Sequence, residues 1–308
     1  MTEAKTRTWL KKNADISLRG KTVVVTGANS GVGYKTAETM LYLGARVILA
    51  CRNPEKADAA RSALEAEYPE SEITVLKLDL ADLSAIDAFV ARIRAQAIDI
   101  DVFVNNAGVL HPPVKQTKDR FELVIGTNYI GVYYLTEKLI PYLSTLPHEV
   151  TYINTISLLH KFVKIDYDDF YCQKRYRTIR AYGRSKICLA KYTYHQAKEL
   201  DCSNVHVYMS HPGISITPMG INAVGPKLRK HARRVQPLFN SPEKSSLAVA
   251  YILAHPRLPA GAIVGPDKCL GGWGYPTVNR TLRKVTTGAE ELVAYTEKEL
   301  AKKTHITL

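Results

Sequence analysis

The sequence lacks any apolar run that approaches the ~18 residues needed to cross a membrane as a helix. Its apolar runs are short, as in Val23–Val25 and Val47–Cys51. The first twenty residues are too polar to contain the apolar stretch of a secretory signal. We therefore expect a soluble, cytoplasmic protein without a membrane anchor.

Cysteine is scarce, and its spacing argues against two ways of stabilising a fold. The chain has 5 cysteines, an odd number, and no Cys-x-x-Cys pair. This pattern is unlike a disulfide framework or a structural zinc site, and it favours reduced thiols. The 9 histidines are scattered along the chain, so we expect no metal site. The cysteines are Cys51, Cys172, Cys188, Cys202 and Cys269.

Neither composition nor length is extreme. The chain has 308 residues, of which 46% are hydrophobic and 23% charged, and ordinary numbers of glycine and proline. These values exclude collagenous, coiled-coil and wholly disordered chains. They predict a globular protein large enough for a substantial core.

Apolar runs rich in β-formers alternate with helical patterns along most of the chain. Alternation of strand and helix is typical of an α/β fold, so we predict a Rossmann-like, doubly wound parallel sheet with helices on both faces. The predicted strands are Thr22–Thr26, Arg46–Cys51, Ile73–Asp79, Val102–Asn105, Val150–Ile156, Val205–His211 and Ala262–Val264. The predicted helices are Val32–Leu43, Pro54–Glu67, Leu83–Ala95, Phe121–Ser144, Arg180–Leu200 and Glu243–Ala254.

The same pattern predicts one domain rather than two. Residues 1–18 precede the first strand as an N-terminal extension, and residues 19–308 form the predicted single domain. Periodicity is poor over residues 214–240, which contain Pro, Gly and Arg. We interpret this stretch as a loop excursion from the sheet, because strand and helix patterns resume after it.

The first predicted strand ends in a glycine-rich turn. Gly27, Gly31 and Gly33 lie between that strand and the next helix. Glycines allow backbone N–H groups to approach a pyrophosphate at the positive end of a helix. A tight turn without a ligand is the alternative, but the position between strand and helix favours dinucleotide binding. The turn also contains Asn29, Ser30 and Val32 as candidate contacts.

The second predicted strand ends without the carboxylate that an NAD-preferring site often presents to the ribose hydroxyls. Arg52 and Asn53 occupy this position. A guanidinium there could pair with a 2′-phosphate, so Arg52 favours NADP over NAD. The alternative is an ordinary surface arginine after a strand.

Three motifs occur in a characteristic order. They are Thr26-Gly27-Ala28-Asn29-Ser30-Gly31-Val32-Gly33, Asn105-Asn106-Ala107-Gly108 and Tyr182-Gly183-Arg184-Ser185-Lys186. Together they resemble the short-chain dehydrogenase/reductase family over roughly residues 18 to 300. The Ala50–Asn53 turn, the Ser157–His160 run and the insert before Tyr182 are similar to its retinol-dehydrogenase-like branch, which lies near the hydroxysteroid dehydrogenases.

This resemblance implies an NAD(P)(H)-dependent oxidoreductase with Tyr182 as acid/base. Tyr182 and Lys186 are i and i+4 on a predicted helix, so both lie on one face. A phenol with a pKa of about 10 is a poor base, and we expect the nearby ammonium to lower that pKa. The family pattern assigns Ser157 to hold the substrate oxygen and Asn128 to hold a water linked to Lys186.

The family pattern also assigns cofactor contacts beyond the glycine-rich turn. Asp79 and Leu80 would meet the adenine, and Tyr182 and Lys186 also count among the contacts. Residues after the fourth strand would line the ribose, and a turn after the sixth would hold the nicotinamide carboxamide. The former are Asn106, Ala107 and Gly108, and the latter are Pro212, Gly213 and Thr217.

We expect the substrate to be a bulky hydrophobic secondary alcohol or ketone. Two apolar segments, His160–Ile179 and Ile214–Asn240, are expected to wall its pocket or, alternatively, to anchor loops to the core. Without a membrane anchor, a hydroxysteroid comes first, and retinol/retinal or another small carbonyl is the alternative. The first segment contains Phe162, Val163, Phe170, Tyr171 and Tyr176, and the second contains Met219, Ile221, Val224, Leu228, Leu238 and Phe239.

A different class of protein also has this fold. A catalytically silent NADP-binding regulator or scaffold would need no acid/base group. All four catalytic positions are filled here, which favours an enzyme. The resemblance further implies a homodimer or homotetramer.

Acidic residues are outnumbered, and the net charge is +13. The excess avoids residues 21–160, whose net charge is −3. It gathers at residues 161–186 and 214–240, each +5, with +3 on residues 1–20. No nucleic-acid motif accompanies it, so we expect no nucleic-acid partner. We predict a solvated lid, a subunit contact or a rim that steers an anionic cofactor or substrate.

Overall fold

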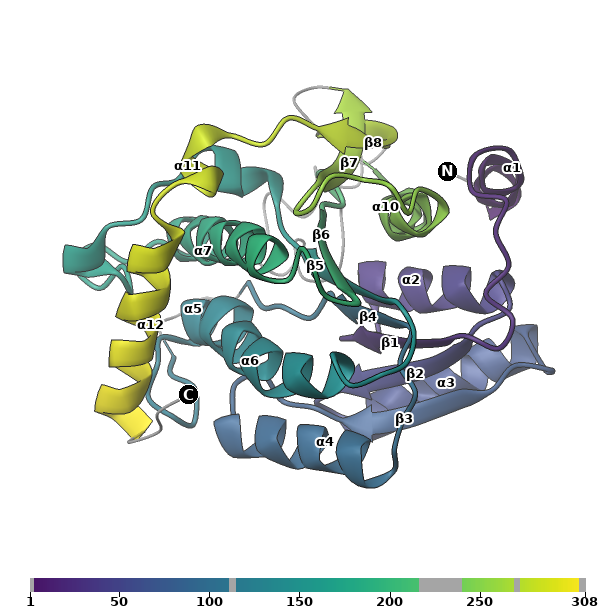
Figure 1. The fold of residues 1–308 in the computed structure, drawn as a ribbon, viewed down its shortest axis with the longest axis horizontal. Coiled ribbons are helices and arrows are strands. Elements are labelled where there is room, and N and C mark those ends of the chain that lie inside the picture. The colour runs from purple at the N-terminus through teal and green to yellow at the C-terminus, as the bar shows by residue number, and fades with distance from the viewer. Residues whose placement is uncertain (1–2, 111–114, 216–239, 269–271, 305–308) are drawn as a thin grey trace, which may run out of the picture.

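The computed structural model describes residues 3–110, 115–215, 240–268 and 272–304. Eight strands form one sheet in the order β3-β2-β1-β4-β5-β6-β7-β8 (Figure 1). Strands β1 to β7 pair in parallel, and β8 is antiparallel to β7. The strands are β1 Thr22–Thr26, β2 Arg46–Cys51, β3 Ile73–Lys77, β4 Val102–Asn105, β5 Val150–Thr155, β6 Val205–Ser210, β7 Ile263–Lys268 and β8 Trp273–Asn279.

Helices cover both faces of the sheet and enclose two apolar cores, as the α/β pattern predicts (Figure 1). One face carries α1 Glu3–Asn13, α2 Gly31–Tyr42, α3 Pro54–Glu67 and α10 Pro242–Ala254. The other carries α4 Leu83–Ala95, α6 Gly131–Leu143, α7 Thr178–Glu199, α11 Arg283–Thr286 and α12 Ala289–Thr304. The predicted Rossmann-like architecture is therefore confirmed.

The predicted helix Phe121–Ser144 is interrupted in the structure. It consists of α5 Leu123–Ile125, a π-helical turn η1 Gly126–Ile130 and then α6. Glu122 begins it, because its carboxylate accepts from the backbone N–H groups of Val124 and Ile125. The π turn contains Asn128, and such turns are frequent at functional sites.

The N-terminal extension packs on the domain rather than standing apart from it. Helix α1 lies against α10, and Leu10 is only 2% exposed. Trp9 stacks on Tyr275 of β8, with ring centroids 6.1 Å apart. Most of the predicted loop excursion, residues 216–239, lies outside the described residues.

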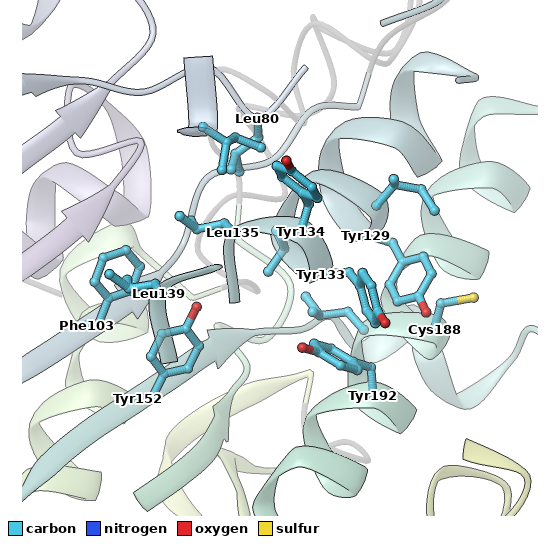
Figure 2. Packing of buried hydrophobic residues seen from close by; sticks show 14 of the residues in the cluster. Leu80, Phe103, Tyr129, Tyr133, Tyr134, Leu135, Leu139, Tyr152, Cys188 and Tyr192 are labelled. Atoms are coloured by element: carbon cyan, nitrogen blue, oxygen red, sulfur yellow. The ribbon is translucent and has the colours of Figure 1, made fainter. Parts of the chain in front are cut away.

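An aromatic cluster fixes α7 against α6 (Figure 2). Tyr133 and Tyr192 have ring centroids 4.7 Å apart, and Tyr129 meets both rings. The Tyr192 hydroxyl donates to Oε1 of Glu137. Close packing of fully buried rings limits helix movement. The cluster therefore holds the helix that carries Tyr182 and Lys186.

Gly131 allows α6 to approach the chain after β3 closely. A Cβ at this position would overlap the backbone oxygen of Leu80. Because backbone cannot rotate away, we expect Gly131→Ala to lower the free energy of unfolding by about 2 kcal/mol in urea titrations. Gly20→Ala is the matched control, because its Cβ would meet nothing within 4 Å. The control variant should lower the free energy of unfolding by only about 1 kcal/mol, because alanine is strained at the positive φ of Gly20. Equal losses would contradict the overlap.

Candidate functional site

A cleft of about 630 Å³ lies at the carboxyl ends of the parallel strands. This edge is where ligands bind in open α/β sheets. Every predicted site residue in the described part lines the cleft except Asn128, and Thr217 lies outside the described residues. The structure thus brings residues from across the sequence to one place.

The glycine-rich turn forms one part of this cleft. Gly27 and Gly31 have positive φ values of 66° and 60°. A Cβ on Gly33 would overlap both the oxygen of Gly27 and the side chain of Asn106. Ser30 precedes α2 without a side-chain cap hydrogen bond, which leaves first-turn N–H groups available to a ligand. The turn fits a pyrophosphate.

Hydrogen bonds join this turn to the end of β4. Thr26 Oγ1 accepts from the backbone N–H groups of Asn106 and Ala107, at 3.0 and 2.9 Å. The Asn106 side chain in turn donates to the Thr26 carbonyl at 3.0 Å. Asn106 and Ala107 are therefore held beside the glycine-rich turn, where the sequence predicted a ribose contact.

Two cations stand at the adenosine end of the cleft. Arg52 follows β2, and Lys56 lies in the first turn of α3, which Asn53 caps by accepting from the Lys56 backbone N–H at 2.8 Å. Within the described part of the chain, neither cation forms an ion pair. Lys56 was not predicted from the sequence. Its signal was a cation in the first turn of the helix that follows Arg52 and Asn53.

Ser157, Tyr182 and Lys186 meet at the other end. The Ser157 hydroxyl lies near enough to the Tyr182 phenol to favour its ionised form. Ser157 Oγ also accepts from the Leu159 backbone N–H at 3.3 Å, which begins the short 3-10 helix η2 Leu158–Lys161. Lys186 Nζ donates to the Thr155 carbonyl at 2.7 Å and lies 5.8 Å from the centre of the Tyr182 ring.

The pKa of Tyr182 shifts in the direction opposite to the one expected from the sequence. We predicted that the Lys186 ammonium would lower the pKa of Tyr182. In the structure burial raises the pKa of Tyr182, and the neighbouring Ser157 hydroxyl opposes that rise. Burial also lowers the pKa of Lys186 to about 8. Loss of solvation dominates both shifts, because Lys186 is buried and Tyr182 is half-buried at the cleft, and poor solvation disfavours each charge.

Asn128 is completely buried and does not line the cleft, but it contacts residues that do. Its Oδ1 accepts from the Val109 backbone N–H at 2.7 Å, and its Nδ2 donates to the Val109 carbonyl at 2.9 Å. A longer bond of 3.3 Å joins Nδ2 to Ser185 Oγ. Asn128 thus fixes Val109, which lines the cleft, against the helix that carries Lys186. Its assignment to a water remains a prediction.

The insert before Tyr182 does not wall the cleft in the described part of the structure, contrary to one expectation. Phe170 and Tyr171 are buried in the core, and Phe162 is 64% exposed. The buried Arg184 guanidinium donates to the carbonyls of Asp169 and Phe170. These contacts attach the insert to α7. Its apolar residues therefore anchor the insert to the core, which was the alternative to a pocket wall. Apolar lining comes from Val109, Leu110, Leu158 and Leu159, and from Ile214 at the start of the second predicted wall segment.

Among the helices that the structure describes, none is long and apolar enough to cross a bilayer.

Comparisons with known proteins give consistent matches. The family model for short chain dehydrogenase matches residues 21–226. Retinol dehydrogenase 12 of Mus musculus is 38% identical over 210 residues, which are 68% of this chain and 66% of that protein, just under two thirds. Retinol dehydrogenase 14 of Homo sapiens is 36% identical over 246 residues, covering 75% and 71%. The crystal structure of an uncharacterized protein from Mycobacterium paratuberculosis has a TM-score of 0.70 and 30% identity, covering 94% and 97%.

Proposed function

Because the chain belongs to the short-chain dehydrogenase/reductase family of NAD(P)-dependent oxidoreductases, we propose that it interconverts a hydrophobic alcohol and its carbonyl compound. One observation carries this proposal. A single cleft has a glycine-rich turn that fits a pyrophosphate and the Arg52 and Lys56 cations on one side, and the Ser157–Tyr182–Lys186 group on the other.

The proposed mechanism divides the work between cofactor and protein. The nicotinamide, when bound, supplies or accepts the hydride. Tyr182 exchanges a proton with the substrate oxygen, and Ser157 holds that oxygen by a hydrogen bond. Since burial raises the pKa of Tyr182, its phenol is protonated at neutral pH and can donate to a carbonyl. Lys186, held by the Thr155 carbonyl, is placed to donate to the ribose.

For the substrate, we propose a retinoid-like primary alcohol or aldehyde. A hydroxysteroid is the first expectation from the sequence, but the named relatives are retinol dehydrogenases, which supports the alternative. The apolar lining around Leu158, Leu159 and Ile214 suits a long hydrocarbon body. A homodimer or homotetramer in the cytoplasm remains our prediction for the assembly and its location.

A substrate panel tests this proposal. We expect kcat/KM for retinaldehyde with NADPH to exceed that for steroid ketones by about tenfold, which corresponds to about 1.4 kcal/mol of differential transition-state binding. Chromatographic separation of retinal from retinol follows the reaction without spectral overlap. A preference for steroid ketones would restore the first expectation, and no turnover with any carbonyl would contradict the proposed function.

Cofactor affinity should depend on pH through Lys186. Burial lowers the pKa of this ammonium to about 8, so above pH 8 the free protein loses a charged donor to the ribose. We expect the Kd for NADP+, measured by calorimetry, to rise by up to about tenfold between pH 7 and pH 9.5. Lys186→Met should bind more weakly but show no such rise. An equal rise in both proteins would assign the effect to another group.

A further inference from the structure

Two buried histidines lie beside the catalytic end of the cleft and have no part in the mechanism above. His160 belongs to η2, and His211 follows β6. Both are 0% exposed. A fully buried imidazole usually satisfies its polar atoms with hydrogen bonds, so the partners of each ring nitrogen are informative.

His160 supports the backbone of Ser157. The Ser157 carbonyl accepts from the His160 backbone N–H at 3.0 Å and is 2.6 Å from His160 Nδ1. A carbonyl oxygen can only accept, so Nδ1 must carry the hydrogen. In a neutral ring the other nitrogen, Nε2, is then an acceptor.

His211 has the opposite arrangement. The Gly213 backbone N–H donates to His211 Nδ1 at 3.0 Å. Nδ1 therefore has no hydrogen, and Nε2 is a donor. This bond shapes the turn in which Gly213 has a φ of 76°. Pro212 and Gly213 of that turn line the cleft.

In each ring, the hydrogen bonds above use Nδ1 and leave Nε2 to be accounted for. Nε2 of His160 and Nε2 of His211 are both buried and have no hydrogen-bond partner among the described residues. One is an acceptor and the other is a donor, so the two atoms are complementary. Leaving both unsatisfied would be costly.

The two rings lie on the same side of the sheet, within electrostatic range of each other. Met209 and Ile263 belong to the core on the α7 side. His211 and Gly265 follow them by two residues and share that side, and the His211 ring occupies the space that a Cβ on Gly265 would fill. Helix η2 packs against α7 as well. A protonated His160 would add to the effect of burial in lowering the pKa of His211.

Both rings are neutral at physiological pH. Burial lowers the pKa of His160 to about 4, and that of His211 to about 3. The ammonium groups of Lys161 and Lys284 contribute to the shift at His160, and Lys161 contributes at His211. The tautomers assigned above therefore persist under assay conditions.

We propose that His160 and His211 form a linked pair of positioning residues, in which the Nε2 hydrogen of His211 bonds through one buried water molecule to Nε2 of His160. A buried water typically satisfies two or more polar groups at once. The pair connects the backbone of Ser157 to the Gly213 turn. Given the proposed function, it sets the distance between the hydroxyl that holds the substrate and the backbone that holds the nicotinamide. Misplacement of reacting groups by a fraction of an ångström slows transfer strongly.

Asparagine variants separate the link from the local hydrogen bonds. Asparagine retains a polar atom at the δ position but has none at the ε position. His160→Asn and His211→Asn should each slow single-turnover hydride transfer by about tenfold, with the Kd for NADP(H) within about twofold. The double variant should also lose only about tenfold, because a link broken at one end is already lost. His160→Ala should lose more, since the Ser157 bond disappears too.

Three results with these variants would overturn the proposal. Additive losses of about a hundredfold in the double variant would show two independent effects. Unchanged transfer rates in both single variants would show no role in positioning. A fall in melting temperature with an unchanged rate would show a purely structural role. His195→Asn, on α7 and outside the cleft lining, is the matched control and should leave the rate unaltered.

A second measurement needs neither variants nor activity. Two-bond ¹⁵N–¹H correlation spectra of the protein labelled at its 9 histidines distinguish the tautomers. We expect one ring locked with hydrogen on Nδ1 and another with hydrogen on Nε2, both unprotonated from pH 8 down to pH 5. Spectra in which every ring protonates in that range would overturn the pair. Since this result is independent of turnover, it separates failure of the pair from failure of the proposed function.

Discussion

Tyr182→Phe is expected to lower kcat by about 10³-fold, because the phenol is the group proposed to exchange a proton with the substrate oxygen. The ring would remain, so packing and the cleft should be preserved. The Kd for NADPH should stay within about twofold of the wild-type value. Steady-state assays with retinaldehyde and calorimetric titration with NADPH measure the two quantities separately.

Tyr194→Phe is the matched control for this experiment. Tyr194 lies on the same helix but does not line the cleft, so its variant should retain the wild-type kcat. An unchanged kcat in Tyr182→Phe would contradict the proposed acid/base. Tight NADPH binding without turnover in the wild type would instead support the alternative of a silent NADP-binding regulator.

Removing both cations from the adenosine end should reverse the cofactor preference. In Arg52→Asp/Lys56→Ser, the cleft would lose two groups placed to pair with a 2′-phosphate and gain a carboxylate for the ribose hydroxyls. We expect the ratio of kcat/KM for NADPH to that for NADH to fall by about 10²-fold or more, since each charged hydrogen bond contributes roughly 1.5–3 kcal/mol.

The single variants test which cation dominates. Arg52→Asp and Lys56→Ser should each account for part of the shift. Lys11→Ser/Lys12→Ser on α1 alters two cations that do not line the cleft and should leave the ratio unaltered. An unchanged ratio in the double variant at residues 52 and 56 would remove both residues from the account of cofactor choice.

Much of the fold could be predicted because local patterns were strong. The bounds of β1, β2, β4, α3 and α4 agree with the predicted ranges. Their strands are short apolar runs buried on both faces, and Asn53 and Asp82 are capping residues that begin the two helices. Elements with weaker local patterns, such as β8, were not predicted. The β8 sequence contains Gly and Pro, and its strand exists because it pairs with β7.

Nearly all the predicted site residues of the described part line the cleft. The glycine-rich turn and the i, i+4 pair depend on local geometry, and the other contacts followed from the family resemblance. Sequence spacing could not show which segments meet. The insert was expected at the pocket wall, yet Tyr171 donates to Glu299 of α12, far along the chain. Tertiary contacts alone decided its position.

The sequence alone determined β1 to β7, most of the helices between them, the glycine-rich turn and the Tyr182–Lys186 pair, because these depend on residues close together in the chain. Tertiary structure decided what depends on burial and on distant neighbours. Burial set the direction of the Tyr182 and Lys186 pKa shifts, opposite to the expectation for Tyr182. Folding also brought Lys56 into the cleft and placed His160 near His211, whose tautomers follow from hydrogen bonds that no sequence spacing reveals.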